Sequence, residues 1–165
     1  MRLNLRIKIG NYTLFGMISK TQTLKGITSK VIDEPNKHYI FWDLENCTLE
    51  QAKETLQDVQ YEFKLGNIFI LSDIDKSFRA FCYSKRYFRK YLHILLSTKY
   101  LDYNFFYWTV QRGYSTLRTS CKQNRKSQDL LYIINGYEDA LIPKKMIQVI
   151  YDTGIIKKGK ALILG

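Results

Sequence analysis

Hydrophobic and polar residues alternate near the start of the chain. The segments LNLRIKI and YTLFGMI place apolar side chains at alternate positions, and a Gly-Asn pair separates them. Such alternation is typical of a β-strand with one buried face, and Gly-Asn pairs favour tight turns. The pattern therefore predicts a β-hairpin over residues 3–18. Residues 19–38 are mostly polar, with Gly26 and Pro35, and we expect a loop or irregular arm there.

The clearest helix signal follows the apolar segment YIFWDL, residues 39–44, which we interpret as a strand. Thr48 suits the N-cap of a helix, and Gln51 three residues later completes a capping box. Apolar residues then recur at helical spacing, which predicts one buried helix face. They are Leu49, Ala52, Leu56, Val59 and Phe63.

The centre of the chain continues with further segments of both kinds. NIFIL and FRAFCY have strand patterns, and the polar SDIDKS between them is too short to contain a helix. SKRYFRKYLHILLST has a helical pattern, whereas YNFFYWTV and YSTLRTS, joined by QRG, predict a second hairpin. The C-terminal part predicts a helix over PKKMIQVIYDTG and a short strand at ALIL.

From residue 39 onward, the predicted order is strand, helix, strand, strand, helix, strand, strand. This βαββαβ order is that of the ferredoxin-like or RRM-like arrangement, an antiparallel sheet with helices on one face. A doubly wound parallel sheet would need a crossover helix between successive strands, which SDIDKS cannot provide. We therefore expect a single α+β domain over residues 1–165. Its parts are an N-terminal hairpin and arm (1–38), an RRM-like core (39–122) and a C-terminal helix and strand (123–165).

The net charge of the chain indicates what kind of partner it binds. The 165 residues carry a formal net charge of +11, and residues 76–126 hold twelve Lys and Arg against one acid, Asp102, together with thirteen aromatic residues. Interleaved basic and aromatic residues favour single-stranded nucleic acid, because phosphates attract cations and bases stack on rings with about 1–3 kcal/mol each. The alternative is a basic helix and hairpin with ordinary core aromatics.

Other compositional features exclude several classes. No apolar run reaches the roughly 18 residues that a membrane-spanning helix needs. The alternating start lacks the apolar block of a signal peptide. Cys47, Cys82 and Cys121 are odd in number and far apart, so we expect neither a zinc ribbon nor a disulfide framework. We therefore expect a cytoplasmic protein with no membrane partner.

Two acidic residues lie at the end of the strand at residues 39–44. Asp43 and Glu45 share one face if the strand continues, because side chains alternate across a sheet. Paired carboxylates are ligands for Mg²⁺ or Mn²⁺, although acids are also favoured at the N-terminus of the following helix. Asp102, the single acid of the basic window, is either a third ligand or an ion-pair partner.

Several basic and aromatic residues are candidates for binding phosphates and bases. Ser77 and Arg79 share a strand face and suit a phosphate group, although a surface Arg is the alternative. Tyr83 and Trp108 are candidate stacking platforms, although strand aromatics are more often part of a core. Candidate contacts to a nucleotide or nucleic-acid backbone are Arg112, Arg118 and Lys122 on the predicted hairpin, and Lys85 and Arg86 at the second helix.

Residues 39–121 resemble the catalytic core of archaeo-eukaryotic-type primases and primase-polymerases. The motifs are FWDLE for Asp-x-Asp/Glu, SFR for Ser-x-His, and Leu101-Asp102 for an apolar residue followed by Asp. Arg79 stands where that family has His. The resemblance implies an RRM-like core, Asp43, Glu45 and Asp102 as ligands of catalytic Mg²⁺ or Mn²⁺, and Ser77 with Arg79 near the phosphates of an incoming nucleotide.

The stretch FWDLENC also resembles the opening of NYN-type ribonucleases of the PIN-like superfamily. That resemblance implies Asp43 as a metal ligand oriented by Asn46, but that fold alternates strands and helices, which SDIDKS opposes. Rolling-circle initiators need a pair of histidines on one strand, and His38 and His93 are distant in sequence. A non-catalytic module that binds single strands through an RRM-like sheet needs no metal, and Arg79 favours it.

Together these patterns predict a replication protein of primase-polymerase type, from a plasmid or virus. It would bind single-stranded nucleic acid and nucleoside triphosphates, with a replicative helicase or accessory primase subunit as a further partner. The NYN-like ribonuclease and the non-catalytic binding module are the alternatives.

Overall fold

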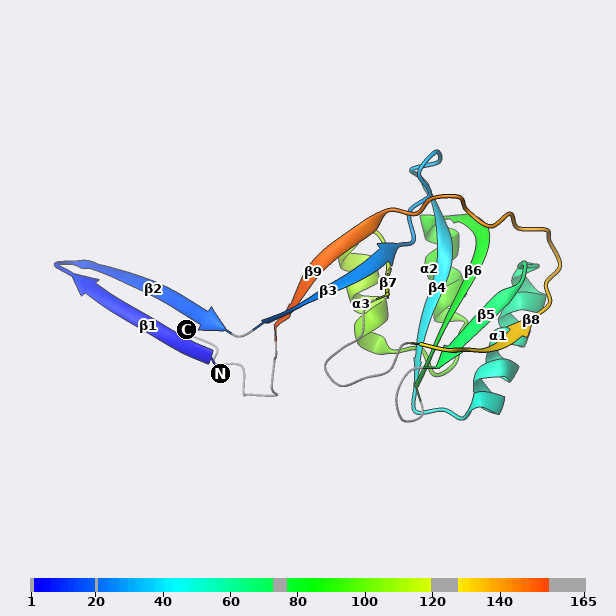
Figure 1. Ribbon diagram of the computed structural model, residues 1–165, viewed down its shortest axis with the longest axis horizontal. Helices are drawn as coiled ribbons and strands as arrows, with labels where there is room; N and C mark the ends of the chain where they lie inside the picture. The colour runs from blue at the N-terminus through cyan, green and yellow to red at the C-terminus, as the bar shows by residue number, and fades with distance from the viewer. Residues whose placement is uncertain (1, 20, 73–76, 120–127, 155–165) are drawn as a thin grey trace. The chain divides into compact units, whose positions relative to one another are not determined.

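The protein is described by a computed structural model, which covers residues 2–19, 21–72, 77–119 and 128–154 (Figure 1). The chain divides into two units, one of residues 1–24 with 150–165 and one of residues 25–149. Every candidate site residue that the structure describes belongs to the second unit.

The first unit contains the N-terminal hairpin that the alternating pattern predicts. β1 (Arg2–Ile9) and β2 (Tyr12–Ser19) pair antiparallel in an unbroken register, from Arg2 opposite Ser19 to Ile9 opposite Tyr12. Gly10 has a φ of 58° in the turn, a conformation that glycine adopts without the steric cost of a Cβ. The predicted N-terminal hairpin is therefore confirmed.

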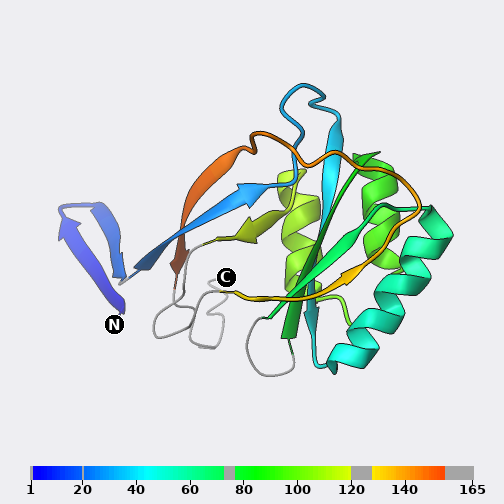
Figure 2. The ribbon, with the colours of Figure 1, turned by 45° about the vertical axis from the view of Figure 1, so that its right-hand side comes forward.

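A four-stranded sheet forms the centre of the second unit (Figure 2). Its strand order is β4-β6-β5-β8, and every neighbouring pair is antiparallel. β4 and β5 are therefore parallel to each other, with β6 between them and α1 connecting them, which is a split βαβ unit. The expected α+β class with antiparallel sheets is confirmed. The elements are β4 (Lys37–Glu45), α1 (Leu49–Phe63), β5 (Ile68–Ser72), β6 (Ser77–Tyr87), α2 (Phe88–Leu96) and β8 (Leu130–Ile134).

α1 and α2 pack on one face of this sheet. Trp42 and Ile70 of the strands are fully buried in one cluster with Leu56 of α1 and Leu95 of α2. These strand residues occupy the even-numbered positions, so alternation assigns the odd-numbered side chains of the same strands to the opposite face. The second helix, predicted from Ser84, begins at Phe88 because β6 continues to Tyr87.

The start of α1 forms as predicted. The backbone N–H of Gln51 donates to Thr48 Oγ1 at 3.2 Å, and the backbone N–H of Thr48 donates to Gln51 Oε1 at 2.9 Å. Two N–H groups that the helix cannot satisfy internally are thereby paired. At the other end, Lys64 adopts the left-handed conformation and its N–H donates to Gln60 O.

The predicted hairpin over YNFFYWTV and YSTLRTS is wrong. Residues 103–112 form a helix, α3 (Tyr103–Arg112), and β7 (Thr116–Arg118) pairs with a different strand. Asp102 caps α3 by accepting from the Asn104 N–H at 2.7 Å, and Gly113, with a φ of 71°, ends it. The abundance of aromatic residues suggested a strand. The helix is favoured by its Asp cap and its Gly stop. It is also favoured by the packing of Phe105 and Phe106 against the hydrophobic core.

The predicted irregular arm and C-terminal helix are also wrong. The arm contains β3 (Thr21–Thr28), and the segment PKKMIQVIYDTG ends in β9 (Gln148–Gly154); the order of this second sheet is β7-β3-β9. A Cβ on Gly26 would lie 2.8 Å from the Leu117 carbonyl oxygen, so this glycine permits a close strand approach and does not mark a loop. β8 had no sequence prediction, and the strand expected at ALIL lies outside the described residues.

The RRM-like detail of the fold prediction is not confirmed. The split βαβ unit has the predicted strand, helix, strand, strand order, but the chain after α2 continues into α3. The fourth strand of the sheet is β8, which lies beside β5. On the outer side of β4, the described residues contribute isolated bridges, one of which pairs Leu44 with Leu101.

Candidate nucleic-acid interface

The face of the four-stranded sheet opposite α1 and α2 carries a row of aromatic rings. Phe69 of β5 stacks on Phe81 of β6 with centroids 4.9 Å apart and rings 13° from parallel. Tyr83 follows at 5.3 Å from Phe81, and Tyr39 of β4 meets Tyr83 edge-on at 6.0 Å. We call these four residues the aromatic face.

The aromatic face is only partly covered. Phe69, Phe81 and Tyr83 are half-buried. Tyr39 is buried in a second cluster with residues that include Leu117 of β7. Across β5, Phe69 is paired with Ile133 of β8, which is 40% exposed. Rings that are positioned by strands but open to solvent are suited to stacking with planar ligands.

An ion pair lies at one end of this face. Asp43 and Arg79 are directly opposite each other on β4 and β6, and Arg79 Nε lies 3.6 Å from Asp43 Oδ2. The side chains are 9% exposed for Arg79 and 24% for Asp43. Arg79, predicted to bind the phosphates of a nucleotide, is therefore paired with Asp43 in the structure, and its charge is partly balanced there.

Gln128 connects Arg79 to a second arginine. With its amide oxygen turned toward the guanidinium, Gln128 accepts from Arg79 Nη1, and its amide nitrogen donates to the Arg118 carbonyl oxygen at 3.2 Å. The structure therefore brings the main chain of Arg118, on β7, close to Arg79. The sequence reasoning included both arginines but had no signal for Gln128.

A main-chain hydrogen bond holds Asp102 next to Asp43. The N–H of Asp102 donates to the Asp43 carbonyl oxygen at 2.8 Å, and the N–H of Glu45 donates to the Tyr100 carbonyl oxygen at 2.9 Å. The carboxylate of Asp102 accepts from the Asn104 N–H as the cap of α3. Glu45 is opposite Ser77 in the β4–β6 register, so the three predicted acids lie near one end of the sheet.

Asp43 and Asp102, two of the predicted metal ligands, have protein partners in the structure. Among the described residues, no three His, Cys, Asp or Glu side chains converge in a group that could hold a metal ion. Asp43 faces a guanidinium and Asp102 faces the first turn of α3, so each already has a positively polarised neighbour. The three-carboxylate site for Mg²⁺ or Mn²⁺ therefore stays a prediction.

Two of the predicted nucleic-acid contacts have structural partners. Lys85 Nζ donates to Glu34 Oε1 at 2.7 Å, and hydrogen bonds from Lys37 and Lys85 lower the pKa of Glu34 to about 2. Arg86 donates to the carbonyl oxygens of Phe63 and Lys64, both at 3.2 Å, and so binds the C-terminal end of α1.

Arg86 also pairs with Glu138 at 3.2 Å. Trp108 and Arg112 lie on α3, where the guanidinium carbon is 5.0 Å from the ring centroid and Trp108 is 50% exposed. Lys122 lies outside the described residues. The sequence reasoning missed Phe69 and Phe81, although their odd-numbered positions in NIFIL and FRAFCY carried the signal.

A buried polar network lies on the side of α2. Ser29 Oγ is 3.0 Å from His38 Nδ1, and the Ser115 N–H donates to Ser29 Oγ at 3.1 Å. Tyr91 Oη lies 2.6 Å from Ser115 Oγ and donates to the Phe41 carbonyl oxygen at 3.0 Å. Burial, and secondarily the charge of Lys30, lowers the pKa of His38 to about 4. His38 is therefore neutral at pH 7.

Comparison of the chain with protein families, curated proteins and solved structures found no match. Within the described part of the chain, no helix is both long enough and apolar enough to cross a membrane.

Proposed function

We propose that the protein binds single-stranded nucleic acid on the aromatic face. The observation that carries the proposal is the row formed by Phe69, Phe81 and Tyr83, which presents half-buried rings on a face that α1 and α2 leave open. Unpaired bases stack on such rings whatever their sequence, whereas a base pair inside a duplex hides both of its ring faces. Single strands are therefore favoured over duplexes.

The charge of the chain supports the same partner. The net charge is +11, from 26 Lys and Arg against 15 Asp and Glu. A polyanion gains affinity from such an excess of cations in a salt-dependent manner. The proposal treats the split βαβ unit as part of a divergent RRM-like sheet and places the protein in the cytoplasm as a replication protein.

The test is fluorescence anisotropy of labelled ten-nucleotide single strands with the wild type and two variants. Phe69→Leu and Phe81→Leu keep an apolar side chain but remove a ring, so each should weaken binding about 5- to 100-fold, which corresponds to the loss of one stacked base. Tyr61→Leu is the matched control, because Tyr61 is an exposed ring on α1. Thermal melts establish that the variants are folded.

The control should bind like the wild type, and a duplex of the same sequence should bind more weakly than the single strand. Equal affinities for Phe69→Leu, Phe81→Leu and Tyr61→Leu would contradict the proposal, as would a preference for the duplex.

A second candidate function is metal-dependent nucleotidyl transfer of primase-polymerase type, with nucleoside triphosphates as substrates and a replicative helicase or accessory primase subunit as partner. One observation favours it: the Asp102 N–H donates to the Asp43 carbonyl oxygen, so two acids 59 positions apart in sequence are adjacent. Metal binding by Asp43 would require its release from Arg79.

One incubation tests this candidate. A labelled single strand is mixed with the protein, nucleoside triphosphates and Mn²⁺ and then analysed for length. Elongation that Asp43→Ala abolishes supports nucleotidyl transfer. If the wild type shortens the strand and Asp43→Ala does not, the protein is the NYN-like ribonuclease instead. If the length of the strand does not change, the protein binds nucleic acid without catalysis.

A further inference from the structure

A pocket of about 830 Å³ lies beside the aromatic face, beneath the chain segment that follows β8. We call residues 138–145 the strap. Tyr39 and Tyr83 of the sheet line the pocket together with the strap and with Val31 and Ile32. A second hollow of about 200 Å³ shares Tyr83 and part of the strap and extends to Phe69. Because both hollows are lined by Tyr83 and the strap, they adjoin the aromatic face.

The strap is attached at its start. Arg86 pairs with Glu138, and the Gly136 N–H donates to Asn67 Oδ1 at 2.8 Å. A Cβ on Gly136 would lie 2.0 Å from the carbonyl carbon of Gly66, so this close approach of two chain segments requires glycine. The position of the strap is therefore set by contacts close to the pocket.

Two apolar side chains in the middle of the strap are exposed. Leu141 is 88% exposed and Ile142 is 72% exposed, although both line the pocket. Apolar side chains that remain in solvent at the mouth of a pocket gain free energy when a ligand covers them.

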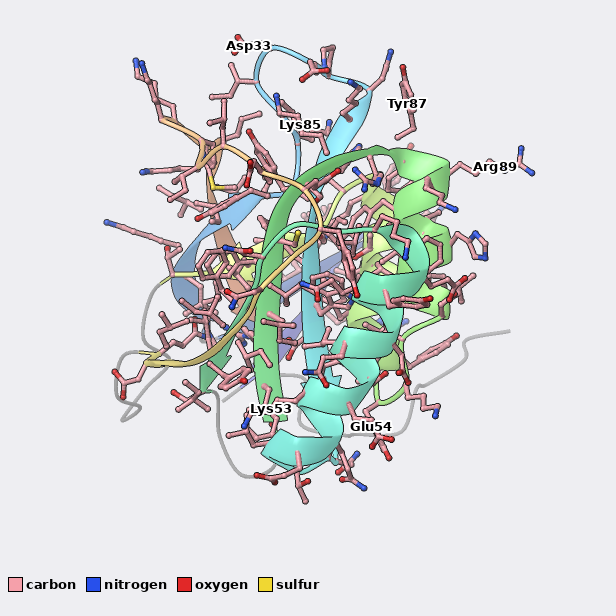
Figure 3. The ribbon with its side chains drawn as sticks, turned by 90° about the vertical axis from the view of Figure 1, so that its right-hand side faces the viewer. Asp33, Lys53, Glu54, Lys85, Tyr87 and Arg89 are labelled. Carbon is pink, nitrogen blue, oxygen red and sulfur yellow. The ribbon has the colours of Figure 1, made fainter. Side chains whose placement is uncertain are left out.

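The charged groups of the pocket fall into two sets. Lys85 and Arg86 are already paired with Glu34 and Glu138, and Figure 3 shows Lys85 and Asp33 at the same end of the sheet. Lys144 and Lys145 have no acidic partner among the described residues. The strap therefore offers two cations that a phosphate can recruit.

Aromatic and acidic residues also line the pocket. Tyr39 and Tyr83 meet edge-on at 6.0 Å, and burial raises the pKa of both, so both remain neutral phenols at pH 7. Asp33 and Asp139 also line the pocket. A carboxylate can accept hydrogen bonds from exocyclic amino groups, which adenine, cytosine and guanine have and thymine lacks.

We infer that this pocket receives one nucleotide of a bound single strand. The base lies between Tyr83 and the apolar strap residues Leu141 and Ile142, and the phosphate is bound by Lys144 and Lys145. The volume is within the range of about 300–1,000 Å³ that is typical of small-molecule sites. This inference rests on the proposed function and adds a subsite to it.

The test uses anisotropy with labelled ten-nucleotide oligo-dA and oligo-dT. Tyr83→Leu should weaken oligo-dA binding about 5-fold or more, since it removes one stacked base, and Tyr83→Phe should retain the affinity. The double variant Lys144→Ala/Lys145→Ala should weaken binding and lower the slope of log affinity against log salt by about 0.7 for each phosphate that the lysines no longer neutralise.

The matched control is Lys90→Ala/Lys99→Ala, which removes two positive charges from exposed positions on and after α2. It should have a clearly smaller effect than the strap double variant. Because Tyr83 packs against Tyr39 and Phe81, thermal melts accompany its variants, whereas the exposed strap lysines test the inference independently of folding. Oligo-dA should bind more tightly than oligo-dT.

The outcomes separate the two proposals. If the wild type binds oligo-dA and neither Tyr83→Leu nor the strap double variant weakens binding beyond the control, the pocket inference is overturned, and the proposed function is then decided by Phe69→Leu and Phe81→Leu. If the wild type binds neither oligonucleotide, the proposed function falls. In that case titration with 5′-AMP, followed by nuclear magnetic resonance, shows whether the pocket still accepts a single nucleotide, and the absence of AMP shifts overturns the inference as well.

Discussion

The two faces of the four-stranded sheet use the same strands in different ways. On one face, Trp42 and Ile70 are fully buried under α1 and α2. On the other, Phe69, Phe81 and Tyr83 remain half-buried. Alternation along a strand separates these two sets by a single residue. One face is therefore suited to holding the fold together, and the other keeps large rings available for a ligand.

This comparison teaches that apolar content alone does not identify a core. The aromatic face carries large rings, as the helix-covered face carries large apolar side chains, yet Phe81 and Tyr83 pack on a second, smaller cluster, and an Asp43–Arg79 ion pair lies at the end of this face. The predictions below test whether stability and binding are divided between the two faces.

The largest expected effect is on stability. Trp42→Ala should destabilise the protein by about 3–5 kcal/mol, because it opens a cavity in the core and leaves Thr98 Oγ1 without the indole donor now at 3.0 Å. Phe81→Ala should cost about half as much, because that ring is only half-buried. Urea unfolding of both variants measures the difference. Equal losses would show that both faces contribute equally to the core.

A smaller effect is expected at the end of the aromatic face. Arg79→Met should cost about 1–3 kcal/mol, because it leaves the partly buried Asp43 without its guanidinium partner. The double variant Asp43→Asn/Arg79→Met should recover part of this loss, which unfolding in urea measures.

The Arg79→Met variant also tests whether Asp43 can bind a metal ion. Releasing Asp43 from Arg79 should strengthen Mn²⁺ binding, measured by isothermal titration calorimetry, and the double variant should abolish the gain. Unchanged Mn²⁺ binding in Arg79→Met would show that the acids at this end are arranged for structure alone.

A pH dependence is expected on the helix-covered side. His38 has a pKa of about 4 in the folded protein and an ordinary value near 6.5 when unfolded, so the unfolded state binds more protons between these values. Stability is therefore complete above pH 6.5 and is lost as the pH falls toward 4, by at most about 1.4 kcal/mol for each pH unit.

Urea unfolding between pH 7 and 5 measures the slope of the unfolding free energy against pH. This range is chosen because it lies above the pH at which Glu34 titrates. His38→Gln should remove most of the slope, whereas His93→Gln, at an exposed position of α2, should retain it. If His38→Gln has the same slope as the wild type, other groups cause the pH dependence.

Local patterns predicted much of the fold. Residues 3–18 alternate without interruption, and the capping box at Thr48 and Gln51 precedes a regular apolar repeat, so both elements follow from interactions within a few residues. The prediction that Asp43 and Glu45 lie at the end of a strand also followed from their positions along it. β8 had no such local signal and β9 was predicted as a helix, because a strand forms only where another strand is available to pair with it.

The sequence by itself determined the hairpin, α1, the antiparallel class of the sheet and the place of the acids at a strand end, because hydrophobic period and capping act over short distances. Only the tertiary structure decided that residues 103–112 are a helix, that Arg79 faces Asp43, and that the strap lies over Tyr83. Each of these depends on segments far apart in sequence, whose side chains and backbone groups satisfy one another only once the chain has folded.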